Sequence, residues 1–460
     1  MKDSSQWSRL DNAAKIFPPT STKSDTKVFR FVCELYEDID PVILQKALDR
    51  TIKQFPFYRS VLKKGLFWYY FENSSNKPKV RPETKPPCSP IYNGDSKNLL
   101  FEVTYYKKRI NLEVFHALSD GTGSMYFLRF LVLFYITEKH KEDFDQVPNL
   151  PDYDASAEQK RLDSFSKYYS KQKGRTRNRL KGAYRLRGEK YPEHRLGIIT
   201  GRISVKSLLE LSHKHNATLS EFLASVMIFS IHEGMSVREE QKPVVITIPV
   251  DLRRYFPTVS ARNFFGVINV AHDFKKQGRE FEDILENIKT AFKKLLTEDF
   301  LRYKMNKMSS LEHNIPAKAV PLILKNFVLK IGNYVAETEI TAAFSNVGKV
   351  VMPPEVSKHI RLFDIFVSTK RLQACMCSFE DAFVISFTSP HKSTNIQRCF
   401  FRKLTSMGVE AEVVSNITGL EPAEQPEPAA DAQKAKESNE NRVKKQKKLK
   451  KQTNIKKGEA

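Results

Sequence analysis

The sequence is poor in the features that mark secreted and membrane-spanning proteins. Its five cysteines are odd in number and scattered, which argues against a disulfide framework and suits a reducing cytoplasm. The first residues contain no apolar segment, so no secretory signal is predicted. The most apolar stretch, 125–136, is too short for a bilayer span and contains Arg129. We therefore expect a cytoplasmic protein without a transmembrane helix.

Clusters of metal-ligating residues are also scarce. Cys375 and Cys377 resemble half of a zinc site, but no further Cys or His follows nearby at a suitable spacing. Alternation along a strand would place both sulfurs on one core face, and we favour that interpretation. The sequence therefore predicts neither a metal site nor a cysteine nucleophile.

Positive charge, by contrast, is abundant, with a formal net charge of +23. Residues 419–460 hold 11 Lys and Arg against 7 Asp and Glu, so most of the excess belongs to the rest of the chain. This tail is too poor in apolar residues to fold alone, and we predict that it is disordered. Its basic end suits peripheral contact with an anionic membrane, and a solvated tail without a partner is the alternative.

A second basic run, 167–187, separates two parts of the chain that each mix helical and strand-like patterns. No recognised binding motif surrounds it, so nucleic-acid binding is not predicted. The pattern indicates an α/β (α+β) layered architecture. The expected organisation is an N-terminal lobe at 1–150, a basic crossover linker at 151–195, a C-terminal lobe at 196–418 and a disordered basic tail at 419–460.

The stretch His116-Ala117-Leu118-Ser119-Asp120-Gly121 is the strongest candidate for chemistry. Residues 110–116 alternate as a strand does, and a buried helix pattern follows Gly121. An apolar setting keeps an imidazole neutral, as a general base requires. Asp120 stands where a helix cap or ion-pair partner would, and Gly121 would permit positive φ and a close approach of ligand. The alternative is a core histidine followed by an ordinary helix cap.

His116-x-x-x-Asp120-Gly121 at the end of a strand resembles the signature of the chloramphenicol acetyltransferase-like superfamily, which includes condensation domains and alcohol acetyltransferases. Three further segments, which follow in the same order as in that superfamily, agree with it. Residues 43–59 resemble its first helix, DLRR at 251–254 with NFFG at 263–266 its second-half site segment, and SNVG at 345–348 its later loop. The similarity is greatest to the alcohol acetyltransferase branch.

The resemblance implies two such lobes with an active-site tunnel between them and His116 near its middle. It implies no bound cofactor, with acyl-CoA as cosubstrate and an alcohol or other hydroxyl compound as acceptor. Asp120 would pair with Arg253 in preference to Arg254. Asn263 would line the cavity, and Ser345 and Asn346 would be candidates to stabilise the oxyanion.

The sequence thus predicts an acyl-CoA-dependent O-acyltransferase that moves an acetyl or short acyl group to a hydroxyl, with His116 as general base. N-acylation remains open. Two alternatives are a non-catalytic condensation-like binding module with a basic partner surface and a carrier-protein-dependent condensation enzyme. No carrier or adenylation segment adjoins the candidate site within the 460 residues.

Overall fold

A computed structural model describes residues 7–94, 97–170, 182–193, 195–313 and 319–417. The predicted disordered tail and part of the predicted basic crossover lie outside these ranges. Residues 1–416 group as one unit. Among its described residues, three sheets contain five, seven and three strands. The predicted boundaries between the lobes remain predictions.

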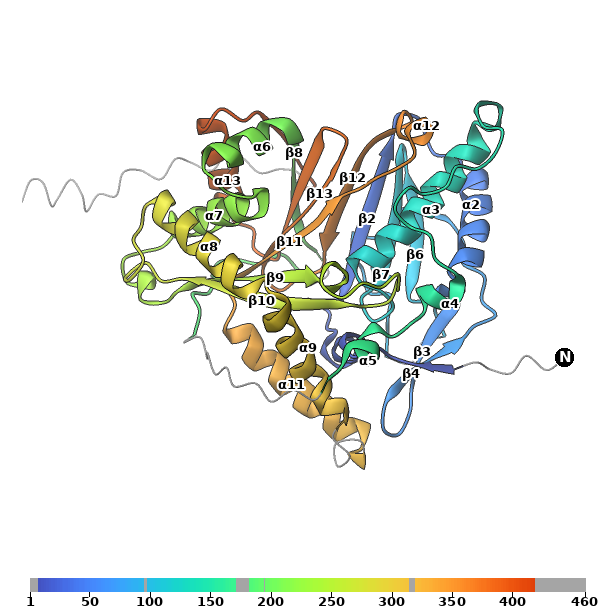
Figure 1. Ribbon diagram of the computed structural model, residues 1–460, viewed down its shortest axis with the longest axis horizontal. Coiled ribbons are helices and arrows are strands. Elements are labelled where there is room, and N and C mark those ends of the chain that lie inside the picture. The colour runs from blue at the N-terminus through green and yellow to red at the C-terminus, as the bar shows by residue number, and fades with distance from the viewer. Residues whose placement is uncertain (1–6, 95–96, 171–181, 194, 314–318, 418–460) are drawn as a thin grey trace, which may run out of the picture. The chain divides into compact units, whose positions relative to one another are not determined.

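Four strands of the five-stranded sheet come from residues 28–115, which belong to the first part of the chain (residues 7–170), and the fifth strand comes from the second part (residues 182–417). His116 directly follows one of these strands. Its strand order is β12-β2-β7-β6-β5. Helices α2 and α3 pack on each other beside it (Figure 1). Asp40 caps α2 by accepting hydrogen bonds from the first backbone amides, as its position before Pro41 leads one to expect. The elements are β2 (Val28–Leu35), α2 (Pro41–Gln54), β5 (Arg81–Pro82), β6 (Phe101–Tyr106), β7 (Arg109–Phe115), α3 (Gly121–Lys139) and β12 (Ile360–Val367).

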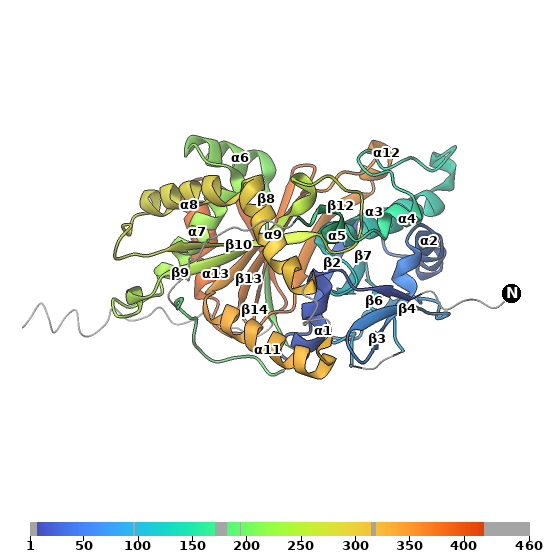
Figure 2. The same ribbon diagram turned by 60° about the horizontal axis from the view of Figure 1, so that its bottom comes forward.

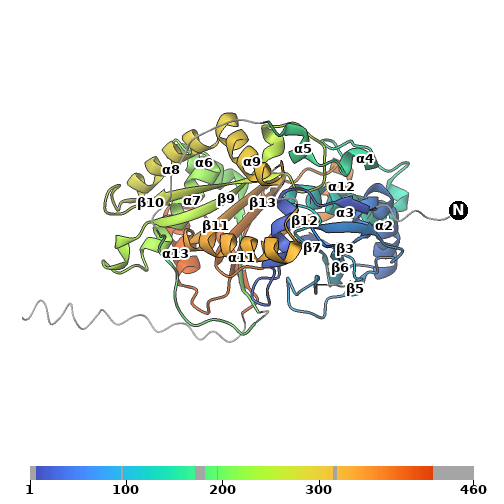
Figure 3. The same cartoon turned by 90° about the horizontal axis from the view of Figure 1, so that it is seen from below.

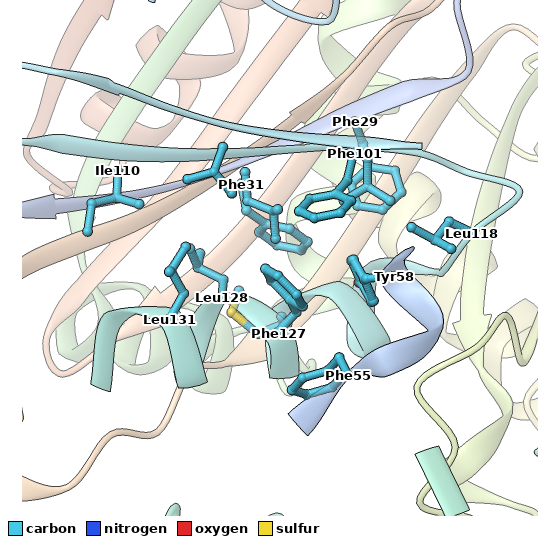
Figure 4. Packing of buried hydrophobic residues seen from close by; sticks show 14 of the residues in the cluster. Phe29, Phe31, Phe55, Tyr58, Phe101, Ile110, Leu118, Phe127, Leu128 and Leu131 are labelled. Atoms are coloured by element: carbon cyan, nitrogen blue, oxygen red, sulfur yellow. The ribbon is translucent and has the colours of Figure 1, made fainter. Parts of the chain in front are cut away.

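The core of this part lies between the sheet and α3. Phe127, Leu128 and Leu131 of α3 face Phe31 and Ile110 of the strands, and all five side chains are fully buried (Figure 4). Since apolar residues recur around most of α3, both of its sides are covered. The strand that precedes His116 therefore packs against a fully buried apolar core.

The seven-stranded sheet belongs to the second part of the chain. Its order is β10-β9-β11-β13-β14-β8-β15, and β11 runs parallel to both of its neighbours. Helices α6, α7, α8 and α13 pack beside it (Figure 1). Its elements are β8 (Gly197–Ser204), α6 (Val205–Lys214), α7 (Leu219–His232), β9 (Val244–Asp251), β10 (Phe265–His272), α8 (Phe281–Leu295), β11 (Ala342–Lys349), β13 (Leu372–Phe379), β14 (Ala382–Ser389), α13 (Asn395–Ser406) and β15 (Ala411–Ser415).

Strand β12 joins the two parts. Its residues fall within the predicted C-terminal lobe at 196–418, but it pairs antiparallel with β2 in the first sheet. All eight residues of β2 are buried, so the edge of β2 needs a partner for its backbone groups. Strand β12 supplies that partner from far along the chain.

The remaining elements are a small sheet and several separate helices. The small sheet has the order β1-β4-β3. None of the helices in the described residues is both long and apolar enough to span a bilayer. These elements include β1 (Trp7–Arg9), α1 (Phe17–Thr20), β3 (Ser60–Lys64), β4 (Tyr69–Asn73), α9 (Glu298–His313), α11 (Leu322–Thr338) and α12 (Pro354–Ser357).

Candidate active site

His116 directly follows β7, and its side chain is only partly exposed. The backbone amide donates to the carbonyl of Lys27, 2.8 Å away, which fixes the chain at the end of the strand. The imidazole stacks on Phe17 of α1, with ring centroids 4.3 Å apart. Phe29 of β2 and Phe265 of β10 approach other edges of the ring, at 5.0 and 5.4 Å. Aromatic rings from three separate elements therefore restrict the orientation of the imidazole.

This environment favours a neutral imidazole. Burial lowers the pKa of His116 below its ordinary value of 6.5, and the negative charge of Asp120 acts in the opposite direction. Because burial is the larger effect, the side chain is unprotonated at pH 7. It can then accept a proton.

Asn263 determines which imidazole nitrogen is available. Its Oδ1 lies 3.2 Å from Nδ1 of His116, while its Nδ2 lies 3.3 Å from the carbonyl oxygen of Ala117 and donates to it. This second contact orients the amide with its oxygen toward the ring. A carbonyl oxygen only accepts, so Nδ1 carries the proton and Nε2 holds the lone pair.

Asp11 accepts a hydrogen bond from the Asn263 amide and so helps to hold it in place. The carboxylate is completely buried and accepts a hydrogen bond from Nδ2 of Asn263 at 3.4 Å. It also accepts from the backbone amide of Ala14 at 2.8 Å and lies 3.4 Å from the guanidinium of Arg262. Burial raises the pKa of Asp11 to about 6, and Arg262 lowers the pKa only in part. A chain of buried polar contacts thus runs from Asp11 through Asn263 to His116.

Asp120 forms the N-cap of α3 and an ion pair with Arg253. Its side chain accepts from the amide of Gly123 at 2.8 Å and from the amide of Phe264 at 2.7 Å. Arg253 donates to both carboxylate oxygens, at 2.9 and 3.2 Å, and both side chains are about 95% buried. The hydrogen bonds from Phe264 and Arg253 join the first part of the chain to the second.

Arg253 and Arg254 have different surroundings. Arg253 also donates to Asp251 at 3.0 Å and to the carbonyl oxygen of Ser260 at 3.0 Å. Arg254 is exposed. The structure therefore pairs Asp120 with the arginine that the resemblance favoured.

Gly121 does not use the positive φ that a glycine permits. Gly121 is the first residue of α3, and φ is not positive there. A Cβ at this position would meet only Val347, at 3.9 Å, so the protein itself leaves room for a side chain. The constrained glycine is Gly123, where a Cβ would lie 2.0 Å from the carbonyl oxygen of Ala261. The backbone of the second part of the chain crosses α3 at this point.

The SNVG segment is a strand and not the expected loop. Ser345 and Asn346 belong to β11, whose pairing with β13 shifts between Asn346 and Gly348. The Asn346 side chain accepts from the amide of Gly348 at 2.9 Å and donates to Ser220 at 3.1 Å. This hydrogen bond and the positive φ of Gly348, 94°, support the irregular backbone. Among the contacts of the described residues, none joins Ser345 or Asn346 to His116.

His116 lines neither of two cavities in the part of the chain that the structure describes. The larger, about 420 Å³, lies at the C-terminal end of α11, and the smaller, about 240 Å³, adjoins Cys88 and Ser368. The expected tunnel between the lobes remains a prediction. His116 nevertheless lies where the two parts of the chain meet, because Asn263 and Phe265 come from the second part.

One group of potential metal ligands lies outside this site. Within the described residues, Glu37, His140 and His359 place ligand atoms within 4.8 Å of one another. The two imidazoles stack with centroids 4.1 Å apart. Stacked rings cannot both direct their in-plane lone pairs at one ion, and Lys139 already binds Glu37 at 2.8 Å. Both Cys375 and Cys377 are buried, as expected for core residues.

Sequence reasoning did not identify Asp11, Phe17 or Gly123 as site residues. Asp11 precedes a short apolar segment, as many helix-capping residues do, and its amide contact with Ala14 is of that kind. Nothing in the sequence connects it with a histidine more than a hundred residues away. Only the tertiary arrangement of β7, β10 and the N-terminal segment brings these groups together.

No protein-family model matches this sequence, and a search of curated proteins finds no match. Solved structures, however, share its fold. Trichothecene 15-O-acetyltransferase TRI3 from Fusarium sporotrichioides has 12% sequence identity and a TM-score of 0.57, with 87% of this chain and 94% of that chain covered. TRI101 of the same fungus, crystallised with coenzyme A and T-2, has 13% identity and a TM-score of 0.59, with 89% and 100% covered.

A first condensation domain of the CDA synthetase has 12% identity and a TM-score of 0.56, and 88% of this chain and 97% of that domain are covered. At such low identities the likeness concerns the fold alone. The chain therefore has the mixed α/β fold of these acetyltransferases and condensation domains, and the predicted fold class is confirmed.

Proposed function

We propose that this protein is an acyl-CoA-dependent O-acyltransferase that transfers an acetyl or short acyl group from coenzyme A to a hydroxyl acceptor. The observation that carries the proposal is the oriented, neutral imidazole of His116 with Nε2 as its free base. Proteins of the same fold have been crystallised with coenzyme A, which supports the choice of donor. The site itself supports the choice of base.

In the proposed reaction, Nε2 of His116 removes the proton from the acceptor hydroxyl as its oxygen attacks the thioester carbonyl. A carbon–oxygen bond forms and the carbonyl becomes a tetrahedral oxyanion. When this collapses, the carbon–sulfur bond breaks, and the imidazolium returns the proton to the departing thiolate. The products are the ester and free coenzyme A, and the enzyme is unchanged. Such general base catalysis typically contributes ~10²–10⁴-fold.

The surrounding residues have supporting roles in this proposal. Asn263 holds Nδ1–H so that the reactive nitrogen keeps one orientation during the proton transfers. Asp120 and Arg253 position the strand end and the helix start and take no proton. Ser345 remains our candidate for oxyanion stabilisation, because no described residue hydrogen-bonds its hydroxyl, whereas the Asn346 amide supports the backbone of β11.

The decisive experiment measures thiol release from a panel of acyl-CoAs with alcohols and amines, for the parent protein and for His116→Ala. We expect the variant to lose ~10²–10⁴-fold in kcat. His213→Ala is the matched control, because His213 is exposed on α6. Its rate should equal that of the parent.

Equal rates for the parent and His116→Ala would refute the catalytic role. If only amines were acylated, the protein would be an N-acyltransferase and not the proposed O-acyltransferase. The absence of turnover with every acyl-CoA, together with turnover of carrier-protein thioesters, would favour the condensation alternative.

A further inference from the structure

Helix α11 presents its apolar side to solvent. Its large side chains are strongly exposed, for example Phe327 at 62% and Ile331 at 49%. At 3.6 residues per turn, these exposed side chains fall within an arc of about 140°. Figures 2 and 3 show the helix on the outside of the molecule, next to α1. The exposed arc includes Ile323, Leu324, Phe327, Val328, Ile331 and Tyr334.

The opposite side of α11 buries a single large apolar side chain, Leu322, and includes two partly buried asparagines, which is unusual for a surface helix. Asn326 is partly buried and donates to the hydroxyl of Tyr69 in β4 at 2.9 Å. Asn333, also partly buried, donates to Glu337 at 2.7 Å. Most of the aromatic and branched side chains of α11 point outward, so packing within the chain does not bury them. Contiguous exposed apolar surface of this kind marks an interaction site.

The β3–β4 hairpin extends the apolar arc at the N-terminal end of α11. Leu66 at its tip is 73% exposed, and Trp68 is 42% exposed. The backbone amide of Leu322 donates to the carbonyl of Leu66 at 2.8 Å, so the tip and the helix are joined. Lys325 donates to the carbonyl of Phe67 and lies 5.6 Å from the centre of the Trp68 ring. Tryptophan beside lysine is typical of a membrane–water interface.

A basic cavity adjoins the other end of the same helix. It has a volume of about 420 Å³ and includes Tyr334, which also belongs to the apolar arc. Glu337 is the one carboxylate among the described residues that line it. The five cationic residues that line it are Arg185, Arg187, Lys190, Lys370 and Arg371. Guanidinium and ammonium groups in such numbers suit phosphate oxygens.

We propose that α11 and the tip of the β3–β4 hairpin dock on an anionic lipid bilayer, with the basic cavity contacting phosphate headgroups. The helix lies in the plane of the interface and does not cross it, in agreement with its length and its two lysines, Lys325 and Lys330. The apolar arc enters the headgroup region while the cations beside it meet negative charge. This inference is independent of the proposed acyl transfer and uses a part of the chain other than the basic tail.

Charge favours a lipid surface over a second copy of the chain. In a symmetric dimer both subunits contribute the same patch, so two surfaces that each include the basic cavity would be brought together. The chain already carries a net charge of +23, and repulsion opposes such a contact. An anionic bilayer satisfies both halves of the patch, since it offers negative headgroups above an apolar interior.

The test compares sedimentation of the full chain with vesicles of phosphatidylcholine alone and of phosphatidylcholine with phosphatidylglycerol. The variant Phe327→Glu/Ile331→Glu should bind the anionic vesicles about tenfold more weakly or worse, because two large apolar side chains no longer enter the interface. The control Leu162→Glu/Val237→Glu changes the net charge equally at two other exposed apolar residues, 52% and 73% exposed. It should bind as the parent does.

Tryptophan fluorescence gives a second readout. The chain has two tryptophans, so Trp7→Phe leaves Trp68 as the only one. Its emission should shift to shorter wavelength with anionic vesicles, and the α11 variant should abolish the shift. Raising the salt concentration should weaken binding through loss of the headgroup contacts.

Three outcomes would overturn the proposal. The first is equal vesicle binding by the α11 variant and its control, and the second is no vesicle binding by the parent. The third is a concentration-dependent dimer that the α11 variant dissociates while vesicle binding is unaffected. Circular dichroism of each variant establishes that a loss of binding occurs in folded protein.

Discussion

At the scale of single residues, the candidate site depends on how each polar group is oriented. The imidazole of His116 is held by ring contacts and by Asn263, and Asn263 is held in turn by Ala117 and Asp11. Each contact is individually modest, but together they select one tautomer and one ring orientation. The reactive nitrogen is therefore prepared before substrate arrives, and no reorganisation is required during the reaction.

The pH dependence of the reaction should reflect the buried histidine. Because burial lowers the pKa of His116 below 6.5, the base stays unprotonated down to more acidic pH than a free histidine. We expect kcat/KM to be constant around pH 7 and to fall only below pH 6.5. Asp11, with a pKa of about 6, titrates in the same range, so the profile is measured for both the parent and Asp11→Asn. If kcat/KM of both proteins already fell with decreasing pH above pH 7, His116 would not be the base.

At the scale of elements, the start of α3 is the most informative feature. The helix begins immediately after the candidate base, its N-cap is Asp120, and its third residue contacts the backbone of the second part of the chain. The two glycines in this turn have different functions. The neighbouring protein atoms leave space for a Cβ at Gly121, whereas they leave none at Gly123.

We therefore expect Gly123→Ala to destabilise the protein by about 1–3 kcal/mol or more, since its Cβ would overlap the carbonyl of Ala261. Gly121→Ala is the matched control and should unfold at nearly the parent's urea midpoint. Thiol release by the Gly121→Ala variant then reports whether ligand needs the space above the helix. A larger loss of stability at Gly121 than at Gly123 would show that this description of the turn is wrong.

At the scale of the whole molecule, contacts between the two parts of the chain form the site. Asp120 and Arg253 make a buried ion pair across this junction, Ser119 donates to the carbonyl of Ala261 at 2.6 Å, and β12 crosses to the first sheet. Removing one member of a buried pair leaves an uncompensated charge, which costs far more than the pair contributes. The junction should therefore be sensitive to single substitutions.

Arg253→Ala should lower the free energy of unfolding by about 3–5 kcal/mol, because the Asp120 carboxylate would lose its cation. Arg254→Ala, at an exposed neighbouring residue, should change it by less than about 0.5 kcal/mol. Urea denaturation of both variants makes the comparison. Similar losses in the two would mean that the Asp120–Arg253 pair does not hold the parts together.

Much of the local structure follows from the sequence. Residues 41–54 and 219–232 form helices whose apolar spacing and caps are visible in the sequence, and β7 ends at Phe115, directly before the histidine. Local signals succeed here because each element carries its own cap and its own apolar face. Strand β10 was not predicted, because its alternation is weak and three of its first residues are not buried.

Local sequence patterns were sufficient to place the histidine at a strand end, to identify the polar cap after it and to predict the mixed α/β class. The tertiary structure decided the partners: Asn263 and Asp11 for the imidazole, Gly123 as the constrained glycine, and β12 as a strand of the first sheet. It also decided that the apolar side of α11 faces outward. Capping and periodicity act within a few residues and are visible in order along the chain. Contacts between distant segments depend on which surfaces meet in the folded protein, and no local pattern encodes them.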